Sequence, residues 1–309
     1  MPYNRFLMQD MKGIFAAAVT PIKETGAPDI DAVPGFLNFL AQRGCHGALL
    51  LGTTGEGPSF SFDERLAIWR ASSNARPDDF QLIAGTGTPS LTESIALNQT
   101  AFDLGFDAVL VLPPYFFRDV GEEGLLDWYS QLIEESVPEG KTLLAYHIPA
   151  VSGIPLPLTL LQRLGKAYPT RFGGLKDSTG RLDSAKNYIS GLQGKSVFVG
   201  NDKLLGPGLA AGASGCITAL ANLRSPELRV IYDAHSRGEA TDRLQAALDP
   251  LRDALDALPP APSYLKAMLH SQHGQPLWPV RPPLEDFSEE ETSAALDALE
   301  GIRGPVRLK

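Results

Sequence analysis

The sequence predicts an α/β protein, a (β/α)8 barrel with a C-terminal helical appendage. Two observations favour this fold. Between residues 13 and 238, eight short apolar segments alternate with segments of helical periodicity. Most of the eight are continuously apolar, as expected of parallel strands that are covered on both faces. Eight successive β/α units can close into a barrel. An open, doubly wound sheet is the alternative that periodicity alone leaves open.

The predicted strands are residues 14–19, 48–51, 81–84, 108–112, 142–146, 173–176, 197–199 and 215–218. Several of the helices between them carry start signals. Ser61 and Ser90 each precede a glutamate by three positions, which is the spacing of a capping box. Ser225 precedes Pro226, and this order predicts a cap residue followed by a first-turn proline.

After residue 238 the pattern is helical only. Helices are predicted over residues 240–258 and 263–271, and a last helix after Ser288. We therefore divide the chain into the barrel, residues 13–238, and a C-terminal helical region, residues 239–309. Residues 1–12 have mixed polarity without the apolar core of a signal peptide, and we expect an N-terminal extension there.

Composition excludes several classes of partner. The chain has 309 residues and a net charge of -9, and its basic residues are not clustered, which argues against a nucleic-acid or anionic-membrane partner. Its apolar runs are shorter than the roughly 18 residues of a membrane span. Cys45 and Cys216 each lie in an apolar run, as expected of reduced core thiols in a cytoplasmic protein. A small anionic substrate remains compatible with this charge.

Lys176 stands at the end of the sixth predicted strand, where polar turn residues begin. In a barrel, the carboxyl ends of the strands hold the active site. Burial disfavours the charged ammonium form of a lysine, and the free amine attacks carbonyl groups to form Schiff bases. A surface lysine that only caps the strand is the alternative from the local sequence.

Other strand ends carry residues suited to the same chemistry. Residues 52–57 combine glycines with two threonines, so their N–H and hydroxyl groups fit a small anion such as a carboxylate; a flexible turn is the alternative. Tyr146 ends the fifth strand, and a phenol there can shuttle protons. His147 faces the opposite side of the strand and is interpreted as a packing residue. The aromatic residues 115–117 wall a pocket, contact another subunit or simply pack.

Two phosphate-binding motifs and a metal site are not supported. The glycines at 85 and 87 lack the third glycine of a dinucleotide fingerprint. Gly194-Lys195-Ser196 resembles the end of a phosphate loop, but Ile189 stands where that loop requires its first glycine. The five histidines lack the HExxH spacing and cysteine partners, so no metal site is indicated.

Together these segments resemble the dihydrodipicolinate synthase and N-acetylneuraminate lyase superfamily of Schiff-base aldolases. The resemblance covers nearly the whole chain and rests on residues 13–21, 52–56, 146–153, 174–177, 200–202 and 212–222. It implies a pyruvate-handling enzyme on a (β/α)8 barrel that needs no cofactor and assembles as a homotetramer, a dimer of dimers.

The resemblance also implies roles for individual residues. Lys176 would form the Schiff base and Tyr146 would act as acid and base. Thr53 and Thr54 would bind the carboxylate of the 2-oxo acid, with Thr53 also near the proton path. The rest of the predicted substrate-binding set is the loop glycines Gly52 and Gly55, Ile217 through its carbonyl near the imine, Val151 and Tyr115.

Two departures from the family's sequence pattern narrow the predicted function. Val151 stands where dihydrodipicolinate synthases carry an arginine that grips the second substrate's carboxylate. Phe116 aligns with a family tyrosine of a relay to a neighbouring active site, and Tyr115 is only adjacent. We therefore predict a Schiff-base lyase that joins or cleaves pyruvate, or another 2-oxo acid, and an aldehyde, acting on a 2-keto-3-deoxy sugar acid. The alternatives are a dihydrodipicolinate synthase, a keto-deoxy-sugar-acid dehydratase, or a silent barrel that acts as a ligand-binding regulator.

Overall fold

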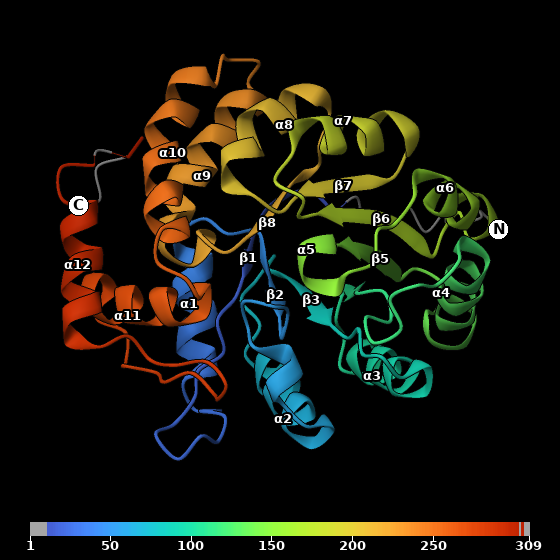
Figure 1. Cartoon of the computed structure of the whole chain (residues 1–309), viewed down its shortest axis with the longest axis horizontal. Helices are drawn as coiled ribbons and strands as arrows, with labels where there is room; N and C mark the ends of the chain where they lie inside the picture. The colour runs from blue at the N-terminus through green and yellow to red at the C-terminus, as the bar shows by residue number, and fades with distance from the viewer. Residues whose placement is uncertain (1–10, 303, 306–309) are drawn as a thin grey trace.

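The computed structural model describes residues 11–302, 304 and 305. Eight parallel strands close into a barrel in sequence order (Figure 1). They are β1 (Gly13–Ala17), β2 (Gly47–Leu50), β3 (Gln81–Gly85), β4 (Ala108–Val111), β5 (Thr142–His147), β6 (Phe172–Asp177), β7 (Ser196–Val199) and β8 (Gly215–Thr218). Because β1 pairs with β8, the sheet has no open edge, and the doubly wound alternative is excluded.

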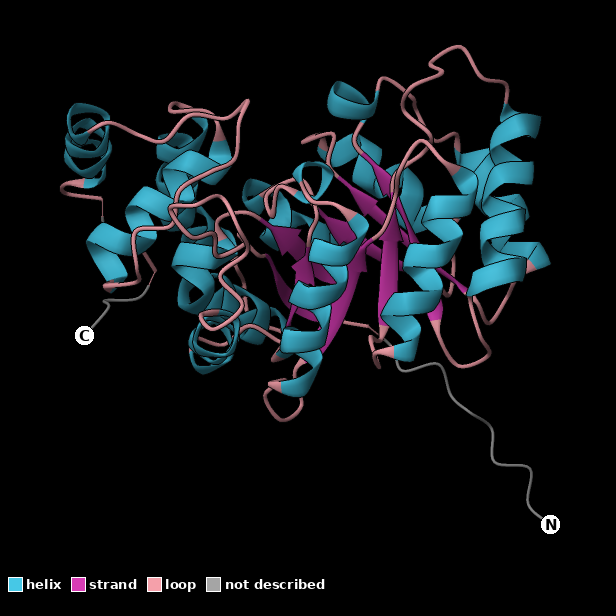
Figure 2. Ribbon diagram, turned by 90° about the horizontal axis from the view of Figure 1, so that it is seen from below, coloured by secondary structure: helices cyan, strands magenta, loops and turns pink. Residues whose placement is uncertain are grey.

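Helices surround the strands (Figure 2). The helices that follow successive strands are α1 (Val33–Gln42), α2 (Phe62–Asn74), α3 (Leu91–Asp103), α4 (Glu122–Ser136), α6 (Leu158–Ala167), α7 (Leu182–Gly191), α8 (Leu205–Ala211) and α9 (Ala221–Ser236). Three short helical turns lie in the loops at the carboxyl ends of strands: η1 (Gly57–Ser59), α5 (Pro149–Ser152) and η2 (Asp202–Leu204).

The strands separate two apolar cores. Alternate strand residues point into the barrel or out toward the helices. Phe15, Leu49 and Leu144 belong to the inner core, whereas Ile14 and Ala48 belong to the outer one. Met11 packs with the inner core ahead of β1. The interior is thus filled by side chains, and an active site is left to the strand ends.

A bulge in β6 determines which way Lys176 points. The pairing of β5 with β6 shifts by one residue, so that Leu143 pairs with Phe172 and Leu144 with Gly174. Gly174 has φ +135°, and a Cβ there would lie 1.9 Å from the carbonyl oxygen of Ser196, so only glycine fits. After the shift, Tyr146 pairs with Lys176. The glycines ahead of the lysine therefore place it beside the tyrosine.

The helix starts agree only partly with the sequence signals. Ser61 makes both bonds of a capping box. Ser90 accepts from the N–H of Glu93, but its own N–H donates to the Thr88 hydroxyl, so the second box is incomplete. The α9 helix joins two helical segments across a kink at Arg224, which has φ -128°. The second segment follows this kink directly, in agreement with the start predicted at Ser225 and Pro226.

The C-terminal region adds three helices, α10 (Asp242–Asp256), α11 (Ala261–His273) and α12 (Glu289–Leu299). They lie together on the side of the barrel that carries α1 and α9 (Figure 1). The α10 helix packs against η2 and α8, and so reaches the loops after β7. The α12 helix follows Ser288, as expected, and begins with a complete capping box at this residue. The predicted domain boundaries stay predictions, and residues 1–10 of the expected extension lie outside the described residues.

Candidate active site

Lys176 and Tyr146 meet at the carboxyl ends of β6 and β5. The Lys176 side chain is buried, with 4% of the residue surface exposed. Its Nζ donates a hydrogen bond to the Tyr146 hydroxyl over 3.2 Å and lies 4.3 Å from the centre of the tyrosine ring. The alternative of a surface lysine that caps the strand is excluded. An amine and a phenol in hydrogen-bond contact are suited to nucleophilic attack with proton transfer.

Both side chains line a cavity of about 240 Å³. Thr53, Thr54 and Ile217, three more of the predicted site residues, also line it. The other lining residues are Ala17, Ile148, Ser178, Gly200, Asn201, Ala219, Arg252, Leu255, Asp256, Pro259 and Ala261. The walls therefore come from the barrel strands, their loops and the C-terminal helices.

The phenol of Tyr146 is electrostatically tuned toward its deprotonated form. Burial by itself raises the pKa of Tyr146. The positive charge of Lys176 and side-chain hydrogen bonds with Thr53, Ser178 and Lys176 lower it by more, so the pKa lies below its usual value. At neutral pH a larger fraction of such a tyrosine is deprotonated than of an isolated phenol, and this deprotonated form can accept the proton of a substrate hydroxyl.

The loop that carries Thr53 and Thr54 is tightly fixed. Within it, the N–H of Glu56 donates to the carbonyl of Thr53 over 3.1 Å. The Thr20 hydroxyl donates to the carbonyl of Gly55 over 2.6 Å. A Cβ at Gly55 would lie 2.7 Å from the Ala18 carbonyl oxygen, so this glycine lets the loop approach the end of β1. The loop presents its two threonines at the cavity in one conformation, as a binding site for a small anion requires.

Four predicted substrate-binding residues are not on the wall of this cavity. Gly52 and Gly55 shape the threonine loop instead of lining the space beside Lys176. Val151 lies on α5 with 54% of its surface exposed. Tyr115 lies near Arg65 and Glu93, where burial raises the pKa of its phenol. Val151 and Tyr115 do not line this cavity within one chain, and their contact with a substrate stays a prediction.

Several cavity residues were not predicted. Ser178 lies two positions after Lys176, and because side chains alternate along an extended chain, that spacing was a usable signal. Arg252 and Asp256 lie one turn apart on α10. Their segment is an ordinary charged helix in the sequence, without a motif that indicates a binding site. Only the packing of α10 against the barrel brings them to the cavity.

His147 packs on the outer side of β5, as predicted. Its Nδ1 accepts a hydrogen bond from the N–H of Leu156 over 3.1 Å, and its ring contacts that of Tyr188. Burial lowers the pKa of His147 despite the nearby carboxylate of Asp177. Cys45 and Cys216 are buried free thiols. Among the described residues, no group of three or more histidine, cysteine, aspartate or glutamate side chains is arranged to hold a metal ion.

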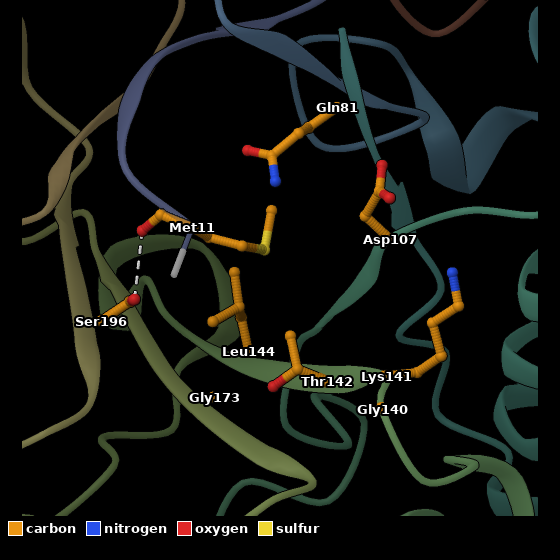
Figure 3. Close-up of a pocket in the computed structure, with 9 residues that line it drawn as sticks. All are labelled: Met11, Gln81, Asp107, Gly140, Lys141, Thr142, Leu144, Gly173 and Ser196. Carbon is orange, nitrogen blue, oxygen red and sulfur yellow. Dashed lines mark hydrogen bonds between the residues drawn. The ribbon is translucent and has the colours of Figure 1, made fainter. Parts of the chain in front are cut away.

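A smaller cavity, of about 50 Å³, lies at the amino ends of the strands (Figure 3). The side chain of Met11 extends into its centre. Its two charged residues already have partners: Lys141 Nζ donates to the Phe106 carbonyl over 2.7 Å, and Asp107 pairs with Arg76 at 2.8 Å. We interpret this cavity as part of the closure of the barrel base.

Comparison with known proteins agrees with this geometry. The profile of the dihydrodipicolinate synthetase family matches residues 10–301. The chain is 38% identical to an uncharacterized DapA-like lyase of Chloroflexus aurantiacus over 296 residues, which are 96% of this chain and 98% of that protein. It is 31% identical to the 4-hydroxy-tetrahydrodipicolinate synthase of Listeria monocytogenes, over 95% of this chain and 99% of the other. A crystal structure of a dihydrodipicolinate synthase from Bacillus anthracis superposes with a TM-score of 0.87 at 26% identity and covers 95% of this chain and 99% of its own.

Proposed function

Because the chain belongs to the dihydrodipicolinate synthetase family of Schiff-base lyases, we propose that it cleaves or forms the C–C bond between pyruvate and an aldehyde in a 2-keto-3-deoxy sugar acid. The observation that carries this proposal is the buried Lys176 amine, 3.2 Å from the Tyr146 hydroxyl, in a cavity that Thr53 and Thr54 also line. A catalytically inactive barrel that only binds a ligand would not require a buried amine and phenol in contact.

The proposed reaction begins with Lys176. Its amine adds to the C2 ketone to form a carbinolamine, which loses water to give an iminium ion. Tyr146 then takes the proton of the C4 hydroxyl, the C3–C4 bond breaks, and its electron pair moves toward the iminium nitrogen. An enamine remains on Lys176 and the aldehyde leaves. Protonation at C3 and hydrolysis release pyruvate and restore the amine.

Thr53 and Thr54 are proposed to hold the carboxylate of the 2-oxo acid while Lys176 attacks. Fixing the ketone in this way replaces a bimolecular encounter by an oriented one, which can supply roughly 7–11 kcal/mol of the barrier. Ile217 is proposed to present its carbonyl oxygen near the imine. Ser178, whose side chain lowers the pKa of Tyr146, is proposed to hold the phenol in position.

Two alternatives use the same iminium ion. A dihydrodipicolinate synthase would condense it with a second substrate that carries its own carboxylate. The family relatives support this alternative, but Val151 supplies no cation for that carboxylate. A dehydratase would expel the C4 hydroxyl as water. The lyase is favoured over the synthase because Arg252, which lines the cavity in addition to Lys176, is already paired with Asp202 and Asp256.

A substrate comparison tests the proposal. Pyruvate release from 2-keto-3-deoxy sugar acids of different lengths would be measured beside the condensation of pyruvate with aspartate semialdehyde. We expect the best sugar acid to be turned over at least tenfold more efficiently, because a carboxylate without a cationic partner binds weakly. Comparable turnover of aspartate semialdehyde would support the synthase instead, and loss of water without pyruvate release would support the dehydratase.

We also propose that the protein works as a homo-oligomer in the cytoplasm. Phe116 and Phe117, in the loop between β4 and α4, are 73% and 70% exposed and contact each other edge to face. Two large aromatic side chains in solvent support a contact with another copy of the chain. Sedimentation velocity of the wild type and of a double variant, Phe116→Ser with Phe117→Ser, tests this: the variant is expected to dissociate to smaller species.

A further inference from the structure

The α10 helix contributes two charged groups to the cavity, and the proposed chemistry at Lys176 does not use them. Arg252 and Asp256 both line the space that Lys176 and Tyr146 line. The guanidinium of Arg252 makes two contacts with Asp256: Nε and Nη2 lie 2.9 and 2.8 Å from Oδ1. A substrate longer than pyruvate, bound to Lys176, would extend from the strand ends toward the helical wall of this cavity.

Asp202 also holds the Arg252 side chain in place. The Nη1 atom of Arg252 donates to Asp202 Oδ2 over 2.8 Å, and the Asp202 side chain is fully buried. The Arg252 side chain is 15% exposed and Asp256 is 47% exposed. Arginine has five N–H donors in a rigid fork, so two aspartates leave part of this fork available. The fork and the neighbouring carboxylate oxygens present donors and acceptors side by side.

The charge around this pair opposes a second carboxylate. The one positive charge of Arg252 is balanced by two aspartates, and the next cation, Lys203, is surrounded by Asp249, Asp253 and Asp256. A negative group brought here would meet excess negative charge. A hydroxyl group, in contrast, both donates and accepts, and it matches an arginine–carboxylate pair without adding charge.

We infer that Arg252 and Asp256 form a subsite for the uncharged, hydroxyl-bearing tail of a 2-keto-3-deoxy aldonic acid, and that Asp202 positions Arg252. This inference rests on the proposed function. It predicts discrimination between two acids of equal length: an aldonic acid, which ends in a hydroxyl, is bound, and the matching aldaric acid, which ends in a second carboxylate, is disfavoured.

The test measures occupancy of Lys176, so it does not depend on whether the bound acid is cleaved or dehydrated. Intact-mass spectrometry after borohydride reduction gives the concentration of each acid that traps half of the protein. The three probes are pyruvate, which has no tail, a six-carbon 2-keto-3-deoxy aldonic acid, and the corresponding aldaric acid. The variants are Arg252→Lys, which keeps a charge beside Asp202, and Asp256→Asn. Asp242→Asn is the matched control, since Asp242 is exposed at the first residue of α10 and does not line the cavity.

For the wild type we expect half-trapping by the aldonic acid at a concentration roughly tenfold below that of the aldaric acid, the size of one charge-assisted hydrogen bond. Arg252→Lys should raise the aldonic acid concentration that traps half of the protein by about tenfold. The corresponding pyruvate concentration should change by less than about twofold. Asp256→Asn should improve trapping of the aldaric acid, and Asp242→Asn should change the trapping of neither acid.

Two results would overturn the inference in distinguishable ways. If pyruvate forms an adduct but Arg252→Lys and Asp256→Asn change all three acids equally or not at all, the subsite is absent while the proposed function stands. If no acid forms an adduct with the wild type, the proposed function fails and the inference fails with it. Circular dichroism of each variant establishes that a loss of trapping does not come from unfolding.

Discussion

Lys266 Nζ lies 2.6 Å from Glu56 Oε1, in an ion pair between residues 210 positions apart. Both side chains are buried, at 2% and 0% exposure. Glu56 directly follows the Thr53–Thr54–Gly55 segment, and Lys266 lies on α11. The lysine also donates to the carbonyl of Pro279 over 2.6 Å. A C-terminal helix thereby fixes the loop that presents the two threonines to the cavity.

Replacing Lys266 with methionine should destabilise the protein strongly. The substitution leaves the Glu56 carboxylate buried without its cation, and breaking a buried pair from one side costs roughly 3–5 kcal/mol. Urea unfolding measures the loss. Lys203→Met is the control, because its pair with Asp253 is exposed and should contribute less than about 1 kcal/mol. Equal losses in the two variants would contradict a structural role for the Lys266–Glu56 pair.

Gly174→Ala should disrupt the bulge that sets Lys176 beside Tyr146. Its φ of +135° excludes other residues, and the added Cβ would lie 1.9 Å from a backbone oxygen, so we expect a loss of at least about 3 kcal/mol in the free energy of unfolding. Gly165→Ala, in α6, has room for the methyl group, with nearest atoms at 3.6 Å, and should stabilise by about 0.5–1 kcal/mol. Thermal unfolding compares the two variants. A Gly174→Ala protein as stable as the wild type would contradict the requirement for glycine in this bulge.

Tyr146→Phe should lower kcat by roughly 10²–10⁴-fold, the usual contribution of a general acid–base group. The pKa of Tyr146 in the free protein lies below its ordinary 10.0, so its basic form accumulates as pH rises, and kcat/KM of the wild type should rise with pH over a range centred below pH 10. The Tyr146→Phe variant should lose this rise with pH. Tyr188→Phe is the control, since its hydroxyl donates to the Leu156 carbonyl on the outer side of the barrel. If the same rise with pH persists in Tyr146→Phe, another group carries out the proton transfer.

Acidification should weaken the fold partly through Glu64. Hydrogen bonds from Arg281 hold the pKa of Glu64 at about 2, below the ordinary 4.5. The folded state therefore binds this proton less readily than the unfolded state, and the stabilisation is present above pH 4.5 and is lost as pH falls toward 2. Urea midpoints over this range should fall less steeply for Glu64→Gln than for the wild type. Parallel curves would show that the Arg281 contact does not contribute.

The barrel was predictable from the sequence because its signals are local. Each strand is a short apolar run, and Lys176, Tyr146 and Thr53 each stand where such a run gives way to a turn. Ser178 was within reach of the same reasoning, since it lies two residues beyond the lysine. The confirmed outward packing of His147 follows from alternation along one strand.

The helical wall of the site was not predictable in this way. Arg252 and Asp256 sit in a helix whose sequence does not differ from an ordinary solvent-exposed one, and Lys266 lies in an apolar helix. Their partners, Asp202 and Glu56, belong to loops far away in the sequence. Only the way in which the C-terminal helices pack brings these charges together. Tyr115 was predicted from its position beside an aligned residue, and adjacency did not determine which way it points.

The most direct test of the account is covalent trapping at Lys176. The protein is incubated with pyruvate, reduced with borohydride and digested, and the modified peptide is sequenced by mass spectrometry. We predict one reduced pyruvate per chain, on Lys176, absent from Lys176→Ala and retained in Lys195→Ala, whose lysine lies outside the cavity. An unmodified wild-type protein, or an adduct that persists when Lys176 is replaced, would contradict the central claim that this buried amine is the nucleophile.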